Sequence, residues 1–418
     1  MCTTNFRGNG LKIQFSKGSK KHMFYENQPV KHQNEYKRML AIIGNLTLLF
    51  SESDCPYLPY RIHENVFCKY FEAENLARMD CSADAKKDRI GVGLKTWVGQ
   101  DDQKVAEFGK LRETFAGLTG IDLVKKIAEY RNERIRVTKN LNGIDKMIYH
   151  IVRRVPGAME ILEHSFEYID INNLKIIKER GNVNNTYFTD GRHVYHFSVS
   201  KNTLYMIFDD MELLDRFEVP IMDDPYGMLM NLVERNGDAT DVEDAVKTET
   251  PRKPSTKQPQ ICLRLYSTKA NGEKFVAEHS GLNQWNGARL NSKTGEYKPR
   301  DPNELYIPYP AEDRTRTAGF FPGRDTIFEL TLPDGKVIPA KICQDDGKAI
   351  MSNPNKLLGE WLLRNVFELP EGTLVTYEML EKFGIDSVVF TKQGELKYSV
   401  DFSEVGTYEE FYEKSNLN

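Results

Sequence analysis

Residues 319–364 read GFFPGRDTIFELTLPDGKVIPAKICQDDGKAIMSNPNKLLGEWLLR. Two short runs in this stretch, TIFELTLP and VIPAKICQ, are rich in β-branched and aromatic residues, and the turn signal Pro333-Asp334-Gly335 separates them. This pattern predicts two strands joined by a tight turn. A helix is expected at 355–366, where the apolar spacing becomes helical. Short strands around a helix predict an open or closed β-barrel.

The same pattern continues on both sides of this stretch. The runs ICLRLYS, ELYIPYP and TLVTYEML are further predicted strands, so the C-terminal part is expected to be mainly β. Upstream, residues 236–259 are polar, rich in Thr and Pro, and almost without large apolar side chains. Such a segment cannot bury a core, so it is predicted to be a linker. The chain is therefore expected to be multidomain, with domains at 1–235 and 260–418.

The C-terminal part resembles a known family. Three segments carry the resemblance: LNQWN at 282–286, ARLNSKTGEYKPRDPNELYIPYP at 288–310, and the stretch 319–364. Together they are similar to the B3-like DNA-recognition domain of restriction endonucleases, in particular to the C-terminal domain of the NgoFVII family. The resemblance covers roughly residues 260–418. It implies a pseudobarrel that grips the major groove of double-stranded DNA with two arms.

Carried onto this chain, the arms are about 284–300 and about 344–356. The implied DNA-binding residues are Gln284, Trp285, Asn286, Arg289, Arg300, Gln344, Asp345, Lys348, Ser352, Asn353, Asn355 and Lys356. Asn, Gln, Arg and Asp side chains can read base edges, whereas Lys, Ser and Arg suit phosphates. Of these residues, Arg289, Arg300, Asn353 and Asn355 are the leading candidates. The alternative is that they are ordinary polar loop residues.

The N-terminal part mixes helices and strands. Helices are predicted at 34–52, 61–76, 102–116 and 121–132, a hairpin at 79–97, and two strands within 186–209. The NgoFVII resemblance implies a phospholipase-D-like nuclease here, which needs a His-x-Lys pair, but none of the eight histidines has that spacing. That mechanism is therefore not carried over. The pattern instead resembles nucleases of the PD-(D/E)XK class, which implies an α/β domain.

The candidate catalytic residues lie on the predicted hairpin. Pairing about the turn KKDR would set Asp80 opposite Lys95 and Asp84 opposite Gly91. One face would then gather two carboxylates and a lysine, and Gly91 and Gly93 would leave room for a metal or a phosphate. In the PD-(D/E)XK class the acidic groups hold Mg²⁺ and the lysine orients or activates the attacking water.

This pattern is incomplete, because Gly93 stands where the motif usually has Asp or Glu. Glu107, 12 residues after Lys95, and Glu64, on the preceding predicted helix, are candidates for the missing carboxylate. The expected catalytic residues are Asp84, Lys95, Glu64, Glu107 and Asp80, with Asp84, Glu107 and Glu64 as Mg²⁺ ligands. The alternative is that Lys95 is a solvated strand residue and the carboxylates flank a turn.

Composition limits the functional class. No run approaches a transmembrane length, no Cys-x-x-Cys pair occurs among the six cysteines, and the start lacks an apolar leader, so a reducing cytoplasm is expected. The net charge of -4 does not favour DNA binding, but basic residues gather within 285–356. The leading hypothesis is a type II restriction endonuclease, plausibly a homodimer on DNA. The alternatives are a non-catalytic DNA-binding regulator, and a nuclease subunit with a separate ATPase partner, since the chain has no phosphate-loop motif.

Overall fold

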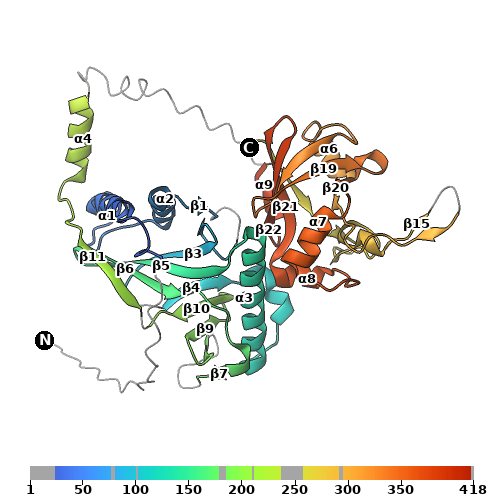
Figure 1. Cartoon of the computed structure of the whole chain (residues 1–418). Coiled ribbons are helices and arrows are strands. Elements are labelled where there is room, and N and C mark those ends of the chain that lie inside the picture. The colour runs from blue at the N-terminus through green and yellow to red at the C-terminus, as the bar shows by residue number, and fades with distance from the viewer. Residues whose placement is uncertain are drawn as a thin grey trace.

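The computed structural model describes residues 24–76, 81–99, 102–177, 185–209, 211–236, 258–290 and 295–415. The N-terminal part holds two sheets and their helices, and the C-terminal part holds a curved sheet beside them (Figure 1). The long helix α3 (Gly120–Asn142) lies between the two parts. In the described part of the chain, no helix combines the length and the apolar character that crossing a membrane requires.

A six-stranded mixed sheet, here called sheet A, forms the centre of the N-terminal part, in the order β1-β2-β3-β5-β6-β11. Among the described strands of sheet A, β3 and β5 are the only parallel neighbours. The segment that connects β3 to β5 contains β4 and α3. Its strands are β1 (Glu74–Asn75), β2 (Ala85–Lys87), β3 (Ile90–Val98), β5 (Lys146–Val155), β6 (Ala158–Ser165) and β11 (Glu212–Glu218).

Two helices, α1 (Val30–Asn45) and α2 (Tyr60–Phe71), cover one face of sheet A (Figure 1). Leu40 and Phe67 from these helices join Val92 and Ile161 of the sheet in one buried cluster. Phe67 and Phe71, four residues apart, lie on one stripe of α2, as an amphipathic helix requires. Two further helical elements are η1 (Thr47–Leu49) and α4 (Pro225–Asn236).

The other face of sheet A packs on a second sheet, sheet B, whose described strands pair antiparallel in the order β4-β10-β9-β8-β7. Tyr149 and Leu162 of sheet A, Phe197 of sheet B and Ile127 of α3 share this second buried cluster. The elements are β4 (Asp102–Glu107), β7 (Lys175–Ile176), β8 (Asn185–Thr189), β9 (Val194–Ser198), β10 (Thr203–Ile207), η2 (Gly109–Phe115) and η3 (Ile171–Asn173).

The C-terminal part is built on a seven-stranded sheet, sheet C, in the order β12-β21-β22-β18-β19-β20-β17. The first and last strands, β12 and β17, also contact each other, so the sheet is nearly barrel-shaped. This confirms the mainly β C-terminal domain. The strands are β12 (Gln260–Arg264), β17 (Ile307–Pro308), β18 (Ile327–Thr331), β19 (Val337–Cys343), β20 (Ala349–Ser352), β21 (Ile385–Gly394) and β22 (Lys397–Glu404).

Two small hairpins and several helices complete the domain. The hairpins are β13 (Ser267–Thr268) with β14 (Lys274–Phe275), and β15 (Arg289–Leu290) with β16 (Tyr297–Lys298). The helices are η5 (Gly281–Asn286), α6 (Ala311–Arg316), η6 (Asp345–Gly347), α7 (Leu357–Gly359), η7 (Glu360–Val366), α8 (Tyr377–Phe383) and α9 (Thr407–Ser415). The expected helix at 355–366 is confirmed as α7 and η7.

The two parts share an interface centred on α3. Val137 and Leu141 of this helix belong to the buried cluster of the C-terminal domain. Nearby, Arg136 Nη1 and Asn140 Nδ2 each donate to the carbonyl oxygen of Val366 at 3.1 Å. Residues 237–257, most of the predicted linker, lie outside the described residues. Among the described residues, the two parts are therefore connected by this packed interface.

Candidate active site and DNA-reading arms

The hairpin that carries the candidate catalytic residues exists, but its register differs from the predicted one. Lys87 pairs with Ile90 and Ala85 with Val92, which moves Asp84 next to Gly93 instead of Gly91. The predicted pairing was wrong because the turn contains two residues, Asp88 and Arg89, and not the four of KKDR. Asp88 has a φ of 53°, in the left-handed region that such tight hairpin turns use.

Three of the expected catalytic side chains, Glu64, Asp84 and Lys95, come together at the edge between α2 and the hairpin. Lys95 and Asp84 each influence the pKa of Glu64, and Asp84 is the main favourable charge acting on Lys95. Asp84 Oδ2 accepts a hydrogen bond from the backbone N–H of Leu94 at 2.7 Å, which fixes the carboxylate against β3. The carboxylates of Glu64 and Asp84 and the ammonium group of Lys95 therefore form one cluster.

The cluster is shielded from water, and this changes the charge balance of its members. Burial raises the pKa of Asp84, and the nearby Lys95 and the Leu94 N–H oppose that change. Burial also raises the pKa of Glu64, which is 6% exposed, while its ion pair with Arg61 at 3.0 Å opposes it. The pKa of Lys95 is lowered by burial, against the attraction of Asp84. Perturbed groups of both signs at one place are typical of functional sites.

The two glycines of β3 do not open a space for a metal or a phosphate, contrary to expectation. A Cβ atom at Gly93 would lie 2.8 Å from Cδ1 of Tyr149, and one at Gly91 would lie 2.9 Å from Cδ1 of Ile144. Large side chains of the second buried cluster therefore fill that space. This explains why position 93 carries no carboxylate: there is no room for one on this face.

The two remaining candidates are Asp80 and Glu107. Asp80 lies outside the described residues. Glu107 ends β4 in sheet B, where its exposed carboxylate pairs with Lys104 at 3.0 Å. Lys104 contributes to the lowered pKa of Lys95, so Glu107 lies at the periphery of the cluster. Glu107 was expected on the predicted helix at 102–116, whereas this part of the chain forms a strand of the other sheet.

The first expected arm includes the hairpin β15–β16, which projects away from the barrel (Figure 1). Arg289 pairs with Lys298 across this hairpin. Tyr297 is 69% exposed, and Lys298 is also exposed. Tyr297 and Lys298 were not among the predicted contact residues, although an aromatic residue beside a basic one is a recognisable signal for nucleic-acid contact.

Other residues of this arm are held inside the domain. With its amide oxygen turned toward Arg300, the buried Gln284 accepts hydrogen bonds from Nε, Nη1 and Nη2 at 3.0, 2.9 and 2.8 Å. Arg300 also pairs with Glu304. Trp285 packs against the buried cluster of the barrel, and Asn286 donates to the Glu278 carbonyl oxygen at 3.0 Å. These contacts support the base of the hairpin.

The second expected arm connects β19 to β20. Gln344 and Asp346 have φ values of 66° and 55°, which turn the chain sharply out of the barrel. Asp345 is almost fully exposed and lies 3.6 Å from the ammonium group of Lys348. The arm therefore presents a carboxylate and a lysine to solvent at one end of β19.

Beyond β20 the expected contact residues have different surroundings. The Ser352 hydroxyl is fully buried, accepts from the Leu358 N–H at 3.0 Å and donates to the Pro354 carbonyl at 2.9 Å, so it is used within the domain and not presented to a phosphate. Asn353 and Asn355 are half-buried and Lys356 is exposed.

The nearly closed barrel of the C-terminal part is consistent with a B3-like domain. Its sequence supports the same conclusion, because residues 256–394 match the family of the NgoFVII C-terminal B3-like DNA-binding domain. The match points to a restriction enzyme with sequence-specific DNA binding. No curated protein matches the chain. The PD-(D/E)XK resemblance of the N-terminal part stays a prediction.

Proposed function

We propose that the chain is a type II restriction endonuclease that hydrolyses phosphodiester bonds of double-stranded DNA with Mg²⁺ at Glu64, Asp84 and Lys95. The observation that carries the proposal is the convergence of these three side chains in the part of the chain that is joined to a DNA-binding domain. Glu64 comes from α2, while Asp84 and Lys95 come from one hairpin, so the packing of the helix on the hairpin forms the cluster.

The arrangement of the surrounding elements supports this proposal. Helix α2 precedes a hairpin, β2–β3, and the chain returns through α3 to a strand, β5, that is parallel to β3. Glu64 lies on the helix, and Asp84 and Lys95 lie on the hairpin. A helix, a hairpin with the acidic group and the lysine, and a crossover helix are what the PD-(D/E)XK resemblance leads us to expect.

The donor set fits Mg²⁺. This ion usually binds one or two protein carboxylates and completes its shell with water and substrate phosphate oxygens. The carboxylates of Glu64 and Asp84 would hold it, and their burial would strengthen the attraction because the dielectric constant is low. When bound, Mg²⁺ supplies a Lewis acid for the phosphoryl oxygen and stabilises the charge that develops on it.

Lys95 and Arg61 have complementary roles in the proposed reaction. Because the pKa of Lys95 is lowered, its side chain gives up a proton more readily than an exposed lysine, which suits a group that orients or activates the attacking water. Arg61 is more than half exposed while its Nη1 atom binds Glu64, so it can approach the DNA backbone and position the Glu64 carboxylate.

The C-terminal arms would bring the scissile bond to this site. On the second arm, Asp345, Lys348, Asn355 and Lys356 are the candidates best placed to reach DNA, with Gln344 and Asn353 beside them. On the first arm, Arg289 stays a candidate, and Tyr297 and Lys298 are added. Gln284, Trp285, Asn286, Arg300 and Ser352 would position the arms. Cutting both strands calls for two active sites, so a homodimer on DNA is part of the proposal.

DNA cleavage by the full chain tests the proposal. Linear genomic DNA digested with Mg²⁺ should give discrete fragments with wild type, whereas Asp84→Asn and Lys95→Ala should bind DNA but cut at least about 100-fold more slowly. Glu113→Gln and Lys125→Ala are matched controls, because both residues are exposed and lie outside the cluster. Both should cut like wild type.

Three results would contradict the proposed site or the proposed reaction. Equal cleavage by Asp84→Asn and wild type would remove Glu64, Asp84 and Lys95 from the mechanism. Specific DNA binding without cleavage in any divalent metal would favour a regulator. Cleavage only after addition of a cell extract and ATP would favour a subunit that works with a separate ATPase.

A further inference from the structure

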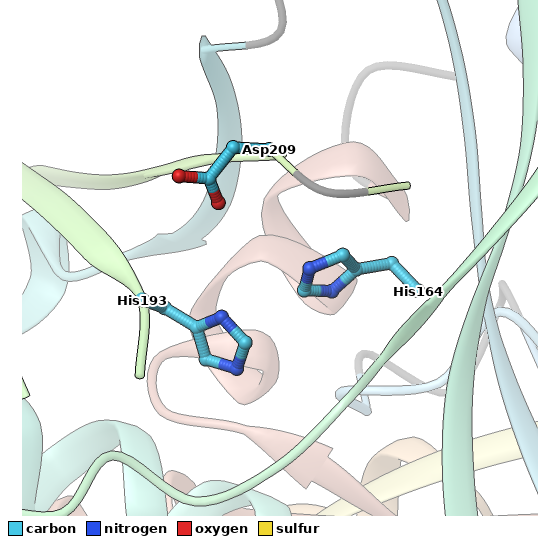
Figure 2. Close-up of side chains that lie close together, drawn as sticks. All are labelled: His164, His193 and Asp209. Atoms are coloured by element: carbon cyan, nitrogen blue, oxygen red, sulfur yellow. The ribbon is translucent and has the colours of Figure 1, made fainter. Parts of the chain in front are cut away.

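Three potential metal ligands form a second group that shares no residue with the proposed catalytic cluster. His164 lies near the end of β6 in sheet A, His193 in the turn between β8 and β9 of sheet B, and Asp209 just after β10. Figure 2 shows the three side chains around a common space. One ligand atom from each lies within 4.8 Å of the other two. In the described part of the chain this is the one group of this kind.

The ring of His164 is set up to offer one particular nitrogen. Its Nδ1 atom lies 2.9 Å from the carbonyl oxygen of Ser165. A carbonyl only accepts, so Nδ1 is the donor, and in the neutral ring Nε2 is the nitrogen that can bind a metal. In metalloproteins a ligating histidine usually donates its other N–H to a carbonyl or a carboxylate, which fixes both the tautomer and the ring orientation.

His193 contributes a nitrogen that is buried without a hydrogen-bond partner among the described residues, namely Nε2. An unpaired buried polar atom costs free energy, so a ligand at this position would offset that cost. Burial, with the neighbouring His164, lowers the pKa of His193 to about 4. The imidazole is thus neutral at pH 7, the form that binds metals.

The backbone around His193 is held firmly. Asp190 Oδ1 accepts from the His193 N–H at 2.8 Å, and the Thr189 hydroxyl donates to the His193 carbonyl at 2.8 Å. The rings of His164 and His193 have centroids 5.0 Å apart and planes inclined by 58°. At this separation both rings can turn a nitrogen toward one ion, and the turn that carries His193 is preorganised for it.

We propose that His164, His193 and Asp209 bind one divalent transition-metal ion of the zinc type. Two imidazoles and a carboxylate suit Zn²⁺, whereas Mg²⁺ prefers oxygen ligands alone. Ligands of a tetrahedral ion lie about 3.4 Å apart, so binding would draw the three groups slightly together. Asp209 is exposed, which allows its carboxylate to move and lets water take the fourth position.

The ion would act as a cross-link between the two N-terminal sheets. His164 belongs to sheet A, while His193 and Asp209 flank strands β9 and β10 of sheet B. Phe208, next to Asp209, packs on Tyr149 of sheet A with ring centroids 5.0 Å apart, so the site lies where the two sheets meet. Binding would stabilise the folded state by mass action, and it would fix the position of one sheet relative to the other.

Metal content of the full chain tests this inference separately from cleavage. All proteins would carry Asp84→Asn, which removes one carboxylate of the proposed Mg²⁺ site, and would be stripped with a chelator and dialysed against Zn²⁺ in excess Mg²⁺. We expect about one bound zinc per chain by mass spectrometry. His164→Asn, His193→Asn and Asp209→Asn should each weaken zinc binding more than about 100-fold. The matched control His32→Asn, on α1 at the other face of sheet A, should bind like the parent.

Cobalt provides a second measurement that does not depend on variants. Co²⁺ in the same parent protein should give the intense visible absorption of a four-coordinate ion, and added Zn²⁺ should abolish it. No stoichiometric zinc in the parent protein would overturn the inference. Zinc binding that survives all three substitutions would also overturn it, and so would a Co²⁺ spectrum of the six-coordinate, water-rich type.

Discussion

Asp84 keeps a carboxylate in surroundings that favour its neutral form. Burial raises its pKa, and only Lys95, Arg61 and one backbone N–H support the charged state. A carboxylate whose pKa is raised by folding stabilises the folded state at low pH, and this contribution is lost as the pH rises through the folded-state pKa. At neutral pH the ionised side chain therefore costs stability, as expected for a group retained for chemistry.

The substitution Asp84→Asn should accordingly stabilise the metal-free protein at pH 7. Each kcal/mol gained would raise Tm by about 2–4 °C for a domain of this size. Thermal unfolding followed by circular dichroism, with chelator present, measures the change. The gain should shrink as the pH falls and the wild-type carboxyl becomes protonated. Glu113→Gln is the control and should shift Tm little. A lower Tm for Asp84→Asn at pH 7 would show that the charge stabilises the fold instead.

At the scale of single elements, β19 offers a direct comparison of two lysines. Lys348 lies in the second arm, beyond one end of the strand, and Lys336 lies in the turn before the other end. Both are exposed, so replacing either should leave the fold intact. Only Lys348 belongs to the surface that is proposed to meet DNA.

We expect Lys348→Ala to weaken DNA binding about equally for all sequences and to reduce the slope of log K against log salt by about one, because one phosphate contact is lost. Lys336→Ala should leave both quantities unchanged. Fluorescence anisotropy with a labelled duplex over a range of salt concentrations measures them. An equal loss for the two lysines would mean that the arm does not approach the backbone.

Elements with a strong local pattern could be predicted from the sequence. The alternating runs around Pro333-Asp334-Gly335 became β18 and β19, and the apolar spacing at 355–366 became α7 and η7. The predicted helix at 102–116 was wrong in its first half, which is strand β4. Phe108, Leu111 and Phe115 have helical spacing and are buried, but on a 3-10 turn that follows the strand. The apolar spacing therefore identified buried residues correctly, but tertiary packing determined the type of secondary structure that carries them.

The same limit applies to other segments. TLVTYEML was expected to form a strand because of its β-branched residues, yet its second half begins helix α8, capped by the Thr376 hydroxyl at the Met379 N–H. The region 186–209 was expected to hold two strands and forms three. The strands β21 and β22 were not predicted. Single-sequence patterns do not show how strands pair across long separations.

The candidate site was partly predictable for a similar reason. Asp84 and Lys95 lie on one hairpin, so local pattern brought them together, although a two-residue error in the turn misplaced their register. Glu64 was found because it precedes the hairpin on a helix. Glu107 was misplaced because its strand joins the other sheet. The cluster of His164, His193 and Asp209 joins three segments and leaves no local signal.

At the scale of the whole molecule, α3 connects the two parts. Val137 and Leu141 complete the buried cluster of the barrel, and Arg136 pairs with Glu368 at 3.2 Å. Lys110 of the N-terminal part also pairs with Glu410 at 2.9 Å. An interface with an apolar centre and a charged rim is expected to hold the two parts together as one cooperative unit.

The double substitution Val137→Ala with Leu141→Ala should uncouple them. Each truncation removes buried methyl groups at a cost of about 1–4 kcal/mol. Because the loss falls on the interface, calorimetry should show two separate unfolding transitions in place of one. Leu123→Ala, within the N-terminal cluster, should lower Tm without dividing the transition. A single transition in the interface variant would show that the two parts stay coupled through other contacts.

The position of α3 also restricts how this protein could acquire a new target sequence. A recognition domain joined only by a tether can be exchanged as a cassette. Here the barrel is incomplete without two side chains from the crossover helix of the other part. A chimera that grafts only residues 258–415 would leave an apolar gap in the barrel and two exposed residues on α3. Changes of specificity are therefore expected to come from substitutions in the projecting arms, and successful grafts to carry 137 and 141 with the barrel.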